Sequence, residues 1–274
     1  QDAADAYSDV TSGNSVATLV REGLALRADS RTRSELQPVP YAGDHYTLRL
    51  GSPSIPQPAL RYLFDETAGA LVEDSGALPL FDARITAPGE LDRSPRRGPG
   101  KKGGGLVFQP GEVIEVPLSR DFRLESPHTI AFWVKFPPKI GENEQEQILQ
   151  YGREGLAWKV SCNLETGRGV RGALKVAGPE GHVIGSTDLA DGNWHHVAYR
   201  FIGGDDSAIT SHLQLFVDGT PETLSDSRSG AIPRGRVGHL RLGGGPREGF
   251  HGWIDELVIY REAISTPAMQ HLLE

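Results

Sequence analysis

The sequence predicts an all-β protein built from many short strands, which is typical of a β-sandwich or a β-barrel. Of its 274 residues, 34 are glycine and 19 are proline. These residues separate short apolar runs, a pattern typical of strands joined by turns. No repeat with a period of roughly 20 to 50 residues is visible, which argues against a propeller or a solenoid.

Twelve runs have the length and composition of strands, and they follow one another after residue 58. They are residues 60–64, 105–108, 113–118, 129–136, 147–152, 156–162, 172–178, 182–188, 194–202, 212–219, 239–244 and 252–260. After the last run, Ser265 can cap a helix and Pro267 is acceptable in a first helical turn. The sequence therefore predicts a short C-terminal helix within residues 265–274.

The predicted strands differ in how their two faces are filled. In residues 194–201 the period of two places Trp194, His196, Ala198 and Arg200 on one face and His195, Val197, Tyr199 and Phe201 on the other. The pair Asp218-Gly219 predicts a hairpin turn after residues 212–217. Residues 252–260 are apolar on both faces, so we expect a central strand in which Asp255 and Glu256 need partners or a cation.

Residues 1–58 differ in composition from the rest and predict a small N-terminal extension. Residues 15–27 fit either a short helix or a pair of strands, 16–20 and 24–28, and we prefer the strand pair. Residues 46–50 alternate like a strand.

A proline-rich linker ends this extension. Pro53, Pro56 and Pro58 each remove a backbone donor and favour an extended chain before them. The predicted domains are therefore 1–58, packed on the sandwich or on a partner, and 59–274.

The charge and the cysteine content exclude several classes of protein. The formal net charge of −8 argues against a nucleic-acid partner, because that charge repels phosphate backbones. The sequence predicts no transmembrane segment. With Cys162 as the single cysteine, neither an intramolecular disulfide nor a thiolate metal cluster can form. Because the sequence starts at Gln1 without methionine, we expect a secreted or periplasmic protein whose signal peptide has been removed.

Six ordered blocks of sequence carry a resemblance to a known family. They are YLFDETAGALVEDSG (62–76), GKKGGGLVFQPGEVIEVP (100–117), HTIAFWVKF (128–136), DGNWHHVAYRF (191–201), LQLFVDG (213–219) and LRLGGG with FHGWIDELVIYREAIS (240–265). This order resembles the laminin-G-like, concanavalin A-like lectin/glucanase superfamily in its bacterial form, over residues 59–274. The resemblance implies a jelly-roll sandwich. It does not specify a function, because the fold occurs in lectins, adhesion modules, structural domains and hydrolases.

The resemblance also implies a calcium site in many members. The candidate ligands are Asp65 after the first sandwich strand, Asp74 in a turn, and Asp255 in the last strand, which in this family lies beside the first. Carboxylates with loop carbonyls suit Ca²⁺. The alternative is that Asp65 and Asp74 cap turns and that Asp255 accepts backbone hydrogen bonds.

A ligand-binding face needs exposed aromatic rings beside polar groups. The candidates are Tyr151, Trp158, His182, Arg247 and Trp253, with ordinary core packing as the alternative for each tryptophan. We expect Trp133 in the core.

The motifs of common enzymes lack the right context. Gly98, Gly100 and Gly103 match G-x-G-x-x-G but lead into a strand. Glu142, Glu144 and Glu146 alternate as in retaining glucanases, yet their surroundings predict a solvated loop, and we expect no catalytic residues.

The sequence thus predicts a non-catalytic extracellular or periplasmic module that recognises a glycan or a protein. One alternative is a structural or accessory subunit of a larger complex, and another is a glycoside hydrolase or lyase.

Overall fold

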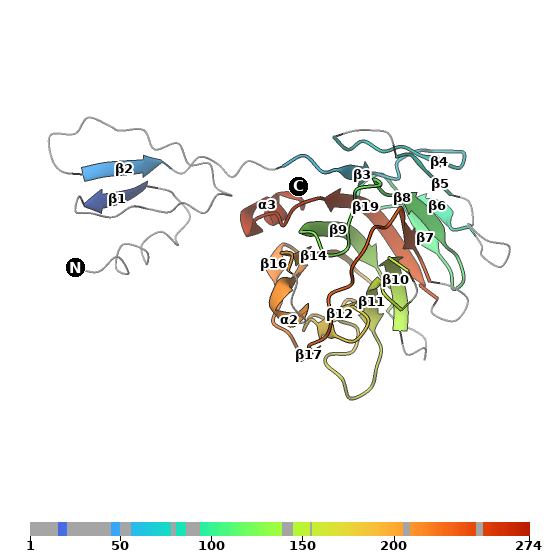
Figure 1. The fold of residues 1–274 in the computed structure, drawn as a ribbon. Coiled ribbons are helices and arrows are strands. Elements are labelled where there is room, and N and C mark those ends of the chain that lie inside the picture. The colour runs from blue at the N-terminus through green and yellow to red at the C-terminus, as the bar shows by residue number, and fades with distance from the viewer. Residues whose placement is uncertain are drawn as a thin grey trace. The chain divides into compact units, whose positions relative to one another are not determined.

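The computed structural model describes residues 16–20, 45–49, 56–77, 81–85, 94–138, 145–153, 155–204, 209–244 and 249–274. The chain divides into two compact units, Gln1–Ser54 and Ile55–Glu274 (Figure 1). This division lies four residues before the predicted boundary at residue 58.

The first unit contains an antiparallel pair of strands. Strand β1 (Val16–Val20) pairs with β2 (His45–Arg49), with Val16 opposite Arg49. The prediction of strands at 16–20 and near 46–50 is confirmed. The predicted partner of β1 was residues 24–28, which lie outside the described residues, and the structure pairs β1 with β2.

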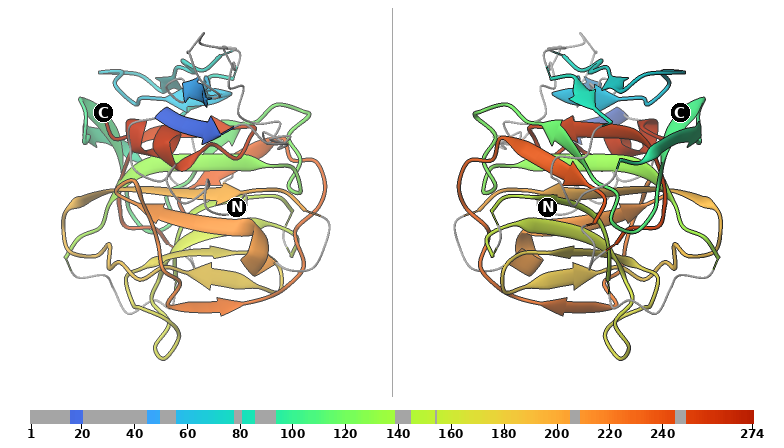
Figure 2. Two further views of the ribbon diagram at one scale, coloured as in Figure 1. Left: turned by 90° about the vertical axis from the view of Figure 1, so that its left-hand side faces the viewer. Right: turned by 90° about the vertical axis from the view of Figure 1, so that its right-hand side faces the viewer.

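The second unit is a sandwich of two antiparallel sheets. The seven-stranded sheet has the order β17 (Asp226–Arg228), β13 (His182–Ile184), β12 (Leu174–Ala177), β11 (Trp158–Asn163), β10 (Gln145–Tyr151), β18 (His239–Leu242) and β8 (Ile114–Pro117). The eight-stranded sheet has the order β16 (Thr220–Pro221), β15 (Leu213–Val217), β14 (Trp194–Phe201), β9 (His128–Lys135), β19 (Gly252–Tyr260), β7 (Gly104–Phe108) and β6 (Arg96–Pro99), and β3 (Leu60–Tyr62) also pairs with β19. In Figure 2 the strands of the sandwich run across the view side by side, with loops at their ends.

All twelve predicted strands are present, and the all-β jelly-roll prediction is confirmed. The elements that were not predicted are short and have few apolar residues to form a pattern. They are β4 (Leu71–Val72), which pairs with β5 (Ala83–Arg84), the strands β6, β16 and β17, and the single-turn helix α2 (Ile209–His212).

Strand β19 is central, as its apolar faces predicted. One of its edges pairs with β9, and its other edge pairs with β7 at Gly252–Ile254 and with β3 at Leu257–Ile259. The register with β9 shifts between Asp255 and Val258, and Glu256 has a φ of 50°. Asp255 therefore lies at a bulge, at the point where the partner of this edge of β19 changes from β7 to β3.

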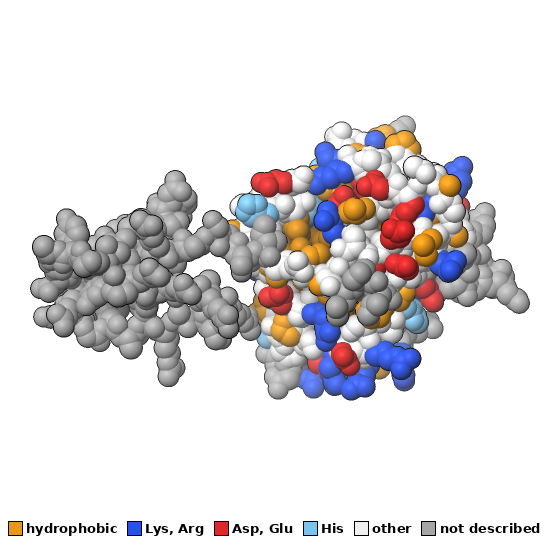
Figure 3. Space-filling view, turned by 90° about the horizontal axis from the view of Figure 1, so that it is seen from above, with side chains coloured by type: hydrophobic (Ala, Val, Ile, Leu, Met, Phe, Trp, Pro, Cys, Tyr) orange, Lys and Arg blue, Asp and Glu red, His pale blue; other side chains and the backbone are white. Residues whose placement is uncertain are grey.

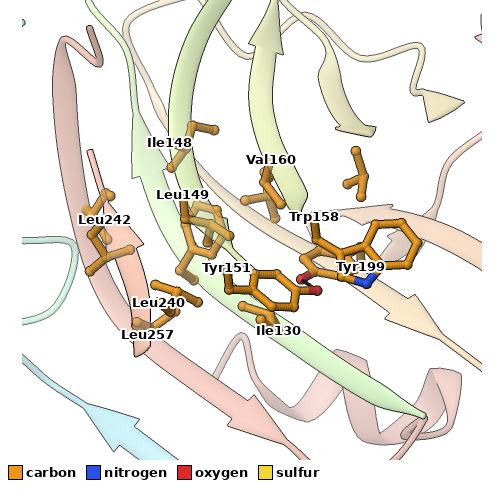
Figure 4. Packing of buried hydrophobic residues seen from close by; sticks show 14 of the residues in the cluster. Ile130, Ile148, Leu149, Tyr151, Trp158, Val160, Tyr199, Leu240, Leu242 and Leu257 are labelled. Carbon is orange, nitrogen blue, oxygen red and sulfur yellow. Dashed lines mark hydrogen bonds between the residues drawn. The ribbon is translucent and has the colours of Figure 1, made fainter. Parts of the chain in front are cut away.

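The core fills the space between the sheets. Figure 4 shows Tyr151, Trp158 and Tyr199 in this space with Ile130, Leu149 and Val160. His128 Nε2 lies 2.6 Å from the hydroxyl of Tyr151, which is hydrogen-bonded to the hydroxyl of Tyr199. These polar atoms therefore satisfy one another inside an apolar layer, as buried polar groups must.

Helix α3 (Thr266–His271) covers part of the outer face of the eight-stranded sheet. Ser265 is its N-cap, accepting a hydrogen bond from the Ala268 N–H, and Pro267 lies in its first turn, as predicted. The helix buries Ala268 and Met269 against apolar side chains of that face. None of the helices in the described part of the chain is long and apolar enough to cross a membrane.

Candidate ligand-binding face

Two of the predicted calcium ligands hold the turn between β6 and β7. Asp255 Oδ2 accepts hydrogen bonds from the backbone N–H groups of Lys101 and Lys102 at 2.8 and 2.9 Å. Asp65 Oδ1 accepts one from Gly104 at 2.7 Å. The remaining oxygen of Asp255 accepts from Glu256 N–H at 2.8 Å. These carboxylates therefore act as acceptors for the backbone of a tight turn.

Two positions of this turn require glycine for steric reasons. A Cβ on Gly100 would lie 1.9 Å from the Gly104 carbonyl oxygen, and one on Gly103 would lie 2.1 Å from Asp65 Oδ1. Gly103 also has a φ of 61°, which favours glycine. The G-x-G-x-x-G spacing thus builds a hairpin that leads into β7, in agreement with the sequence prediction.

Burial raises the pKa of Asp255 to about 6, and the three backbone hydrogen bonds oppose that rise. The side chain is fully buried. Its ionised form is held by N–H dipoles rather than by a salt bridge, since no lysine or arginine of the described residues forms one with it.

Asp74 has a different environment. Its Oδ1 accepts from the N–H groups of Arg61 and Gly76 at 3.0 and 2.9 Å, whereas its buried Oδ2 has no partner. Within the described residues, no group of three or more His, Cys, Asp or Glu side chains could hold a metal ion, so the three predicted ligands do not form one such group. The predicted calcium site, to which loop carbonyls would also contribute, stays a prediction.

The outer face of the eight-stranded sheet carries an aromatic and cationic row. Lys135 of β9 lies opposite Trp194 of β14 on one side and Trp253 of β19 on the other. Val107 of β7 lies opposite Trp253. We call Trp194, Lys135, Trp253 and Val107 the tryptophan row. All four are partly exposed, and Lys135 Nζ lies 5.6 Å from the centre of the Trp253 ring.

A second row, made of Trp133 and His196, lies on the same face between the tryptophan row and α3. Trp133 pairs with His196, and their rings meet edge to face with centres 5.3 Å apart. Lys101 Nζ lies 4.6 Å from the centre of the Trp133 ring. Trp133 is buried, as predicted, but on the outer face of the sheet beneath Lys101. Its Nε1 and the Nδ1 of His196 are buried without a hydrogen-bond partner.

A pocket of about 310 Å³ opens beside the second row. Its lining includes Arg61, Lys102, His196, Glu256 and His271. Burial lowers the pKa of His196 to about 4; Asp218 opposes this shift and Lys102 adds to it. His196 is therefore a neutral imidazole at pH 7, able to donate from one nitrogen and accept at the other.

The predicted ligand-binding residues do not form one site. Tyr151 and Trp158 are 1% and 0% exposed, so they belong to the core and the prediction of a binding role is wrong for these two. Trp158 Nε1 donates to the Leu124 carbonyl at 3.0 Å. His182 is buried in the other sheet, with Nε2 3.0 Å from Asp226 Oδ2. Arg247 lies outside the described residues. Trp253 alone of the five lies on the exposed tryptophan row.

Trp194 and Lys135 were not predicted to lie on this face. The alternation of residues 194–201 could have indicated Trp194, since Val197, Tyr199 and Phe201 face the core. His195 and His196 point to opposite faces, as predicted, and His195 contacts Asp218 and Asp191 at 2.9 and 3.2 Å.

The prediction of a solvated loop is wrong for Glu146. This residue lies in β10, is 3% exposed and accepts a hydrogen bond from His251 N–H at 3.4 Å. Burial raises its pKa to about 7, and that hydrogen bond opposes the rise. Glu142 and Glu144 lie outside the described residues.

Acidic and basic side chains are interspersed around a group of hydrophobic ones on the side of the sandwich drawn in Figure 3. The net charge of −8 is therefore not gathered on this side of the described surface. The local charge of one face can therefore differ from the net charge of the chain.

Several solved structures share this fold. The binding domain of Paraclostridial mosquitocidal protein 1 aligns with a TM-score of 0.54 and 14% identity over 79% of this chain and 52% of that one. Domain 4 of AbnA, a GH43 extracellular arabinanase from Geobacillus stearothermophilus in complex with arabinotriose, aligns at 0.55 and 19%, over 80% of this chain and 100% of that one. The Trypanosoma rangeli sialidase aligns at 0.52 and 19%, over 80% and 33%. This chain thus spans about half of the first structure and a third of the third, and such identities show the fold alone.

Among curated proteins, no sequence matches this chain. A family model, described as the concanavalin A-like lectin/glucanases superfamily, matches residues 111–268. This match spans more than half of the sequence and includes β9, β14 and β19, the strands that carry the tryptophans of the two rows. The chain therefore belongs to the concanavalin A-like lectin/glucanases superfamily.

Proposed function

We propose that this chain is a non-catalytic module that recognises a carbohydrate on the tryptophan row. The observation that carries the proposal is the register Trp194–Lys135–Trp253, which places two partly exposed indole rings on either side of one cation. The rings lie two strand spacings apart, roughly 10 Å. A short saccharide can span that distance, with apolar ring faces on the indoles and hydroxyls near Lys135.

The comparisons support a binding role in general terms. Two of the structures that share the fold are the binding domain of a mosquitocidal protein and a domain of an arabinanase in complex with arabinotriose. The same fold also occurs in a sialidase, so the likeness does not choose between binding and catalysis.

The structural argument against catalysis concerns Glu146. Its raised pKa suits a general acid, but glycoside hydrolysis needs two carboxyl groups on either side of a substrate groove. Glu146 is almost fully buried, so a substrate cannot reach it without rearrangement. We expect no release of reducing ends from a panel of glucans, galactans and arabinans. Cleavage by the natural protein that is lost in Glu146→Gln would show an enzyme instead.

The binding proposal is tested with a glycan array followed by calorimetry. The natural protein should bind a saccharide that Trp253→Ala and Trp194→Ala bind at least tenfold more weakly. Stacking of a nucleic-acid base on an aromatic ring is worth about 1 to 3 kcal/mol, and we expect a sugar face on an indole ring to gain a similar amount. Leu156→Ala, at a side chain that is 53% exposed, is the matched control and should bind normally. Equal binding by the natural protein and the three variants would contradict the proposal. Binding to a protein that carries no glycan would instead favour an accessory subunit.

We further propose that the module acts outside the cell or in the periplasm, where extended glycans are accessible. Its buried Cys162 is compatible with an oxidising compartment, because a buried thiol is shielded from oxidants.

A further inference from the structure

The proposed binding face carries basic side chains, although the chain as a whole is acidic. The formal net charge is −8. Yet three lysines lie on or above the outer face of the eight-stranded sheet, beside its tryptophans and His196. We call Lys101, Lys102 and Lys135 the lysine group.

Each member of the lysine group has a defined place. Lys101 Nζ lies over Trp133 and Lys135 Nζ over Trp253, at 4.6 and 5.6 Å from the ring centres. Lys102 lines the pocket with His196. The backbone of Lys101 and Lys102 is fixed by Asp255, so the turn holds their side chains above the face.

The carboxylates near this face are occupied by other groups. Both oxygens of Asp255 accept from backbone N–H groups. Asp218 bonds to the His195 ring and to the His196 N–H, both at 2.9 Å. Glu256 lies 3.4 Å from Arg61. Glu274, which lines the pocket with Lys102, lies 3.6 Å from the ring of His271. Among the described residues, no carboxylate lies within salt-bridge distance of the three lysine ammonium groups.

The second row adds an unpaired hydrogen-bond donor. Trp133 Nε1 is buried and has no acceptor, although a buried N–H ordinarily has one. Since Lys101 lies over the same ring, an anionic group that contacts Lys101 would be near a donor that the protein leaves unsatisfied. A neutral saccharide offers no charge to compensate the three ammonium groups.

We propose that the ligand is an acidic saccharide, whose carboxylate or sulfate group binds the lysine group while its sugar ring stacks on the tryptophan row. This inference rests on the proposed function and names the class of its ligand. The aromatic side chains stack on the sugar rings, and the lysines favour an anionic sugar over a neutral one. A long, densely charged polyanion is disfavoured by the net charge of the chain, so isolated acidic groups along a saccharide fit best.

The test compares matched ligands by calorimetry with the full chain. The probes are a tetragalacturonate, its fully methyl-esterified form, a sulfated galactan tetrasaccharide and an unsulfated galactan tetrasaccharide. The protein should bind the carboxylate probe, the sulfate probe or both at least tenfold more tightly than the matched neutral probe. Which acidic probe binds more tightly distinguishes a carboxylate from a sulfate site. Binding should weaken as sodium chloride is raised from about 50 to 500 mM, because salt screens exposed charges.

Variants separate the lysine group from the stacking surface. Lys101→Gln and Lys135→Gln should each weaken binding of the acidic probe by about three- to tenfold and should weaken binding of the neutral probe by less. Lys159→Gln, in β11 of the other sheet, is the matched control and should change neither.

The outcomes are distinguishable. If neutral and acidic probes bind equally, with dependence on Trp253 and not on the lysines, the ligand-class inference is overturned and the proposed function stands. If no saccharide binds, the proposed function fails together with the inference. Tighter binding of a single-stranded oligonucleotide than of any saccharide would also overturn the inference.

Discussion

Asp255 of β19 accepts a 2.8 Å hydrogen bond from the backbone N–H of Lys101, 154 residues earlier in the chain. This bond joins the last strand of the sandwich to the turn between β6 and β7. Because Lys101 lies over Trp133, the buried carboxylate also fixes one cation of the binding face. We therefore expect the same turn to matter both for stability and for the proposed ligand recognition.

The first prediction concerns the glycines of that turn. Gly100→Ala should lower the free energy of unfolding by about 2 kcal/mol or more, because its Cβ would lie 1.9 Å from the Gly104 carbonyl oxygen and 2.5 Å from Asp255 Oδ2. Gly238→Ala is the matched control, since a Cβ there meets no atom within 4 Å, and it should be nearly neutral. Urea unfolding of both variants measures the difference. Similar stabilities would show that the turn is not closely packed.

Most of the fold was predictable because apolar residues alternate along its strands. All twelve predicted strands follow from this alternation, and Ser265 with Pro267 located α3. Strands such as β4 and β16 have two residues each, too few to form a pattern. Residues 158–162 also alternate, with Trp158, Val160 and Cys162 in the core, and this signal could have excluded Trp158 from the binding face.

The binding face was less predictable, for a physical reason. Trp194, Lys135 and Trp253 become neighbours only through the register of β14, β9 and β19. A single sequence gives the faces of each strand but not which residues lie opposite each other on the next strand. The burial of Glu146 was missed because the predicted strand began at Gln147, whereas β10 begins at Gln145.

The second prediction is a pH dependence that arises from Glu146. Its folded-state pKa of about 7 lies above the ordinary value of 4.5, so the folded protein binds the proton more tightly than the unfolded chain. The stability from this group is therefore full below about pH 4.5 and is lost as the pH rises through 7. Each pKa unit corresponds to about 1.4 kcal/mol, so the loss is on the order of 3 kcal/mol.

Glu146→Gln isolates this contribution from that of Asp255, whose raised pKa acts in the same direction at lower pH. The variant should become more stable relative to the natural protein as the pH rises from 5 to 8, as measured by urea unfolding at each pH. A stability difference that stays constant over this range would contradict a buried, titrating Glu146.

The third prediction concerns calcium. If Asp74 binds Ca²⁺ through its unpartnered Oδ2, chelation with EGTA should lower the melting temperature of the natural protein. Asp74→Ala should melt at the same temperature with and without the chelator. Elemental analysis gives an independent measure of bound metal. An unchanged melting curve in EGTA, with no calcium bound, would remove the site.

The most direct test of ligand recognition at the tryptophan row is calorimetric titration of an acidic tetrasaccharide into the natural protein, Trp253→Ala and Leu156→Ala. Trp253 lies on the tryptophan row, whereas Leu156 is an exposed hydrophobic residue elsewhere in the sequence. We expect saturable binding by the natural protein and by Leu156→Ala, with affinity at least tenfold lower in Trp253→Ala at equal thermal stability. Equal affinities in all three proteins would contradict recognition at the tryptophan row.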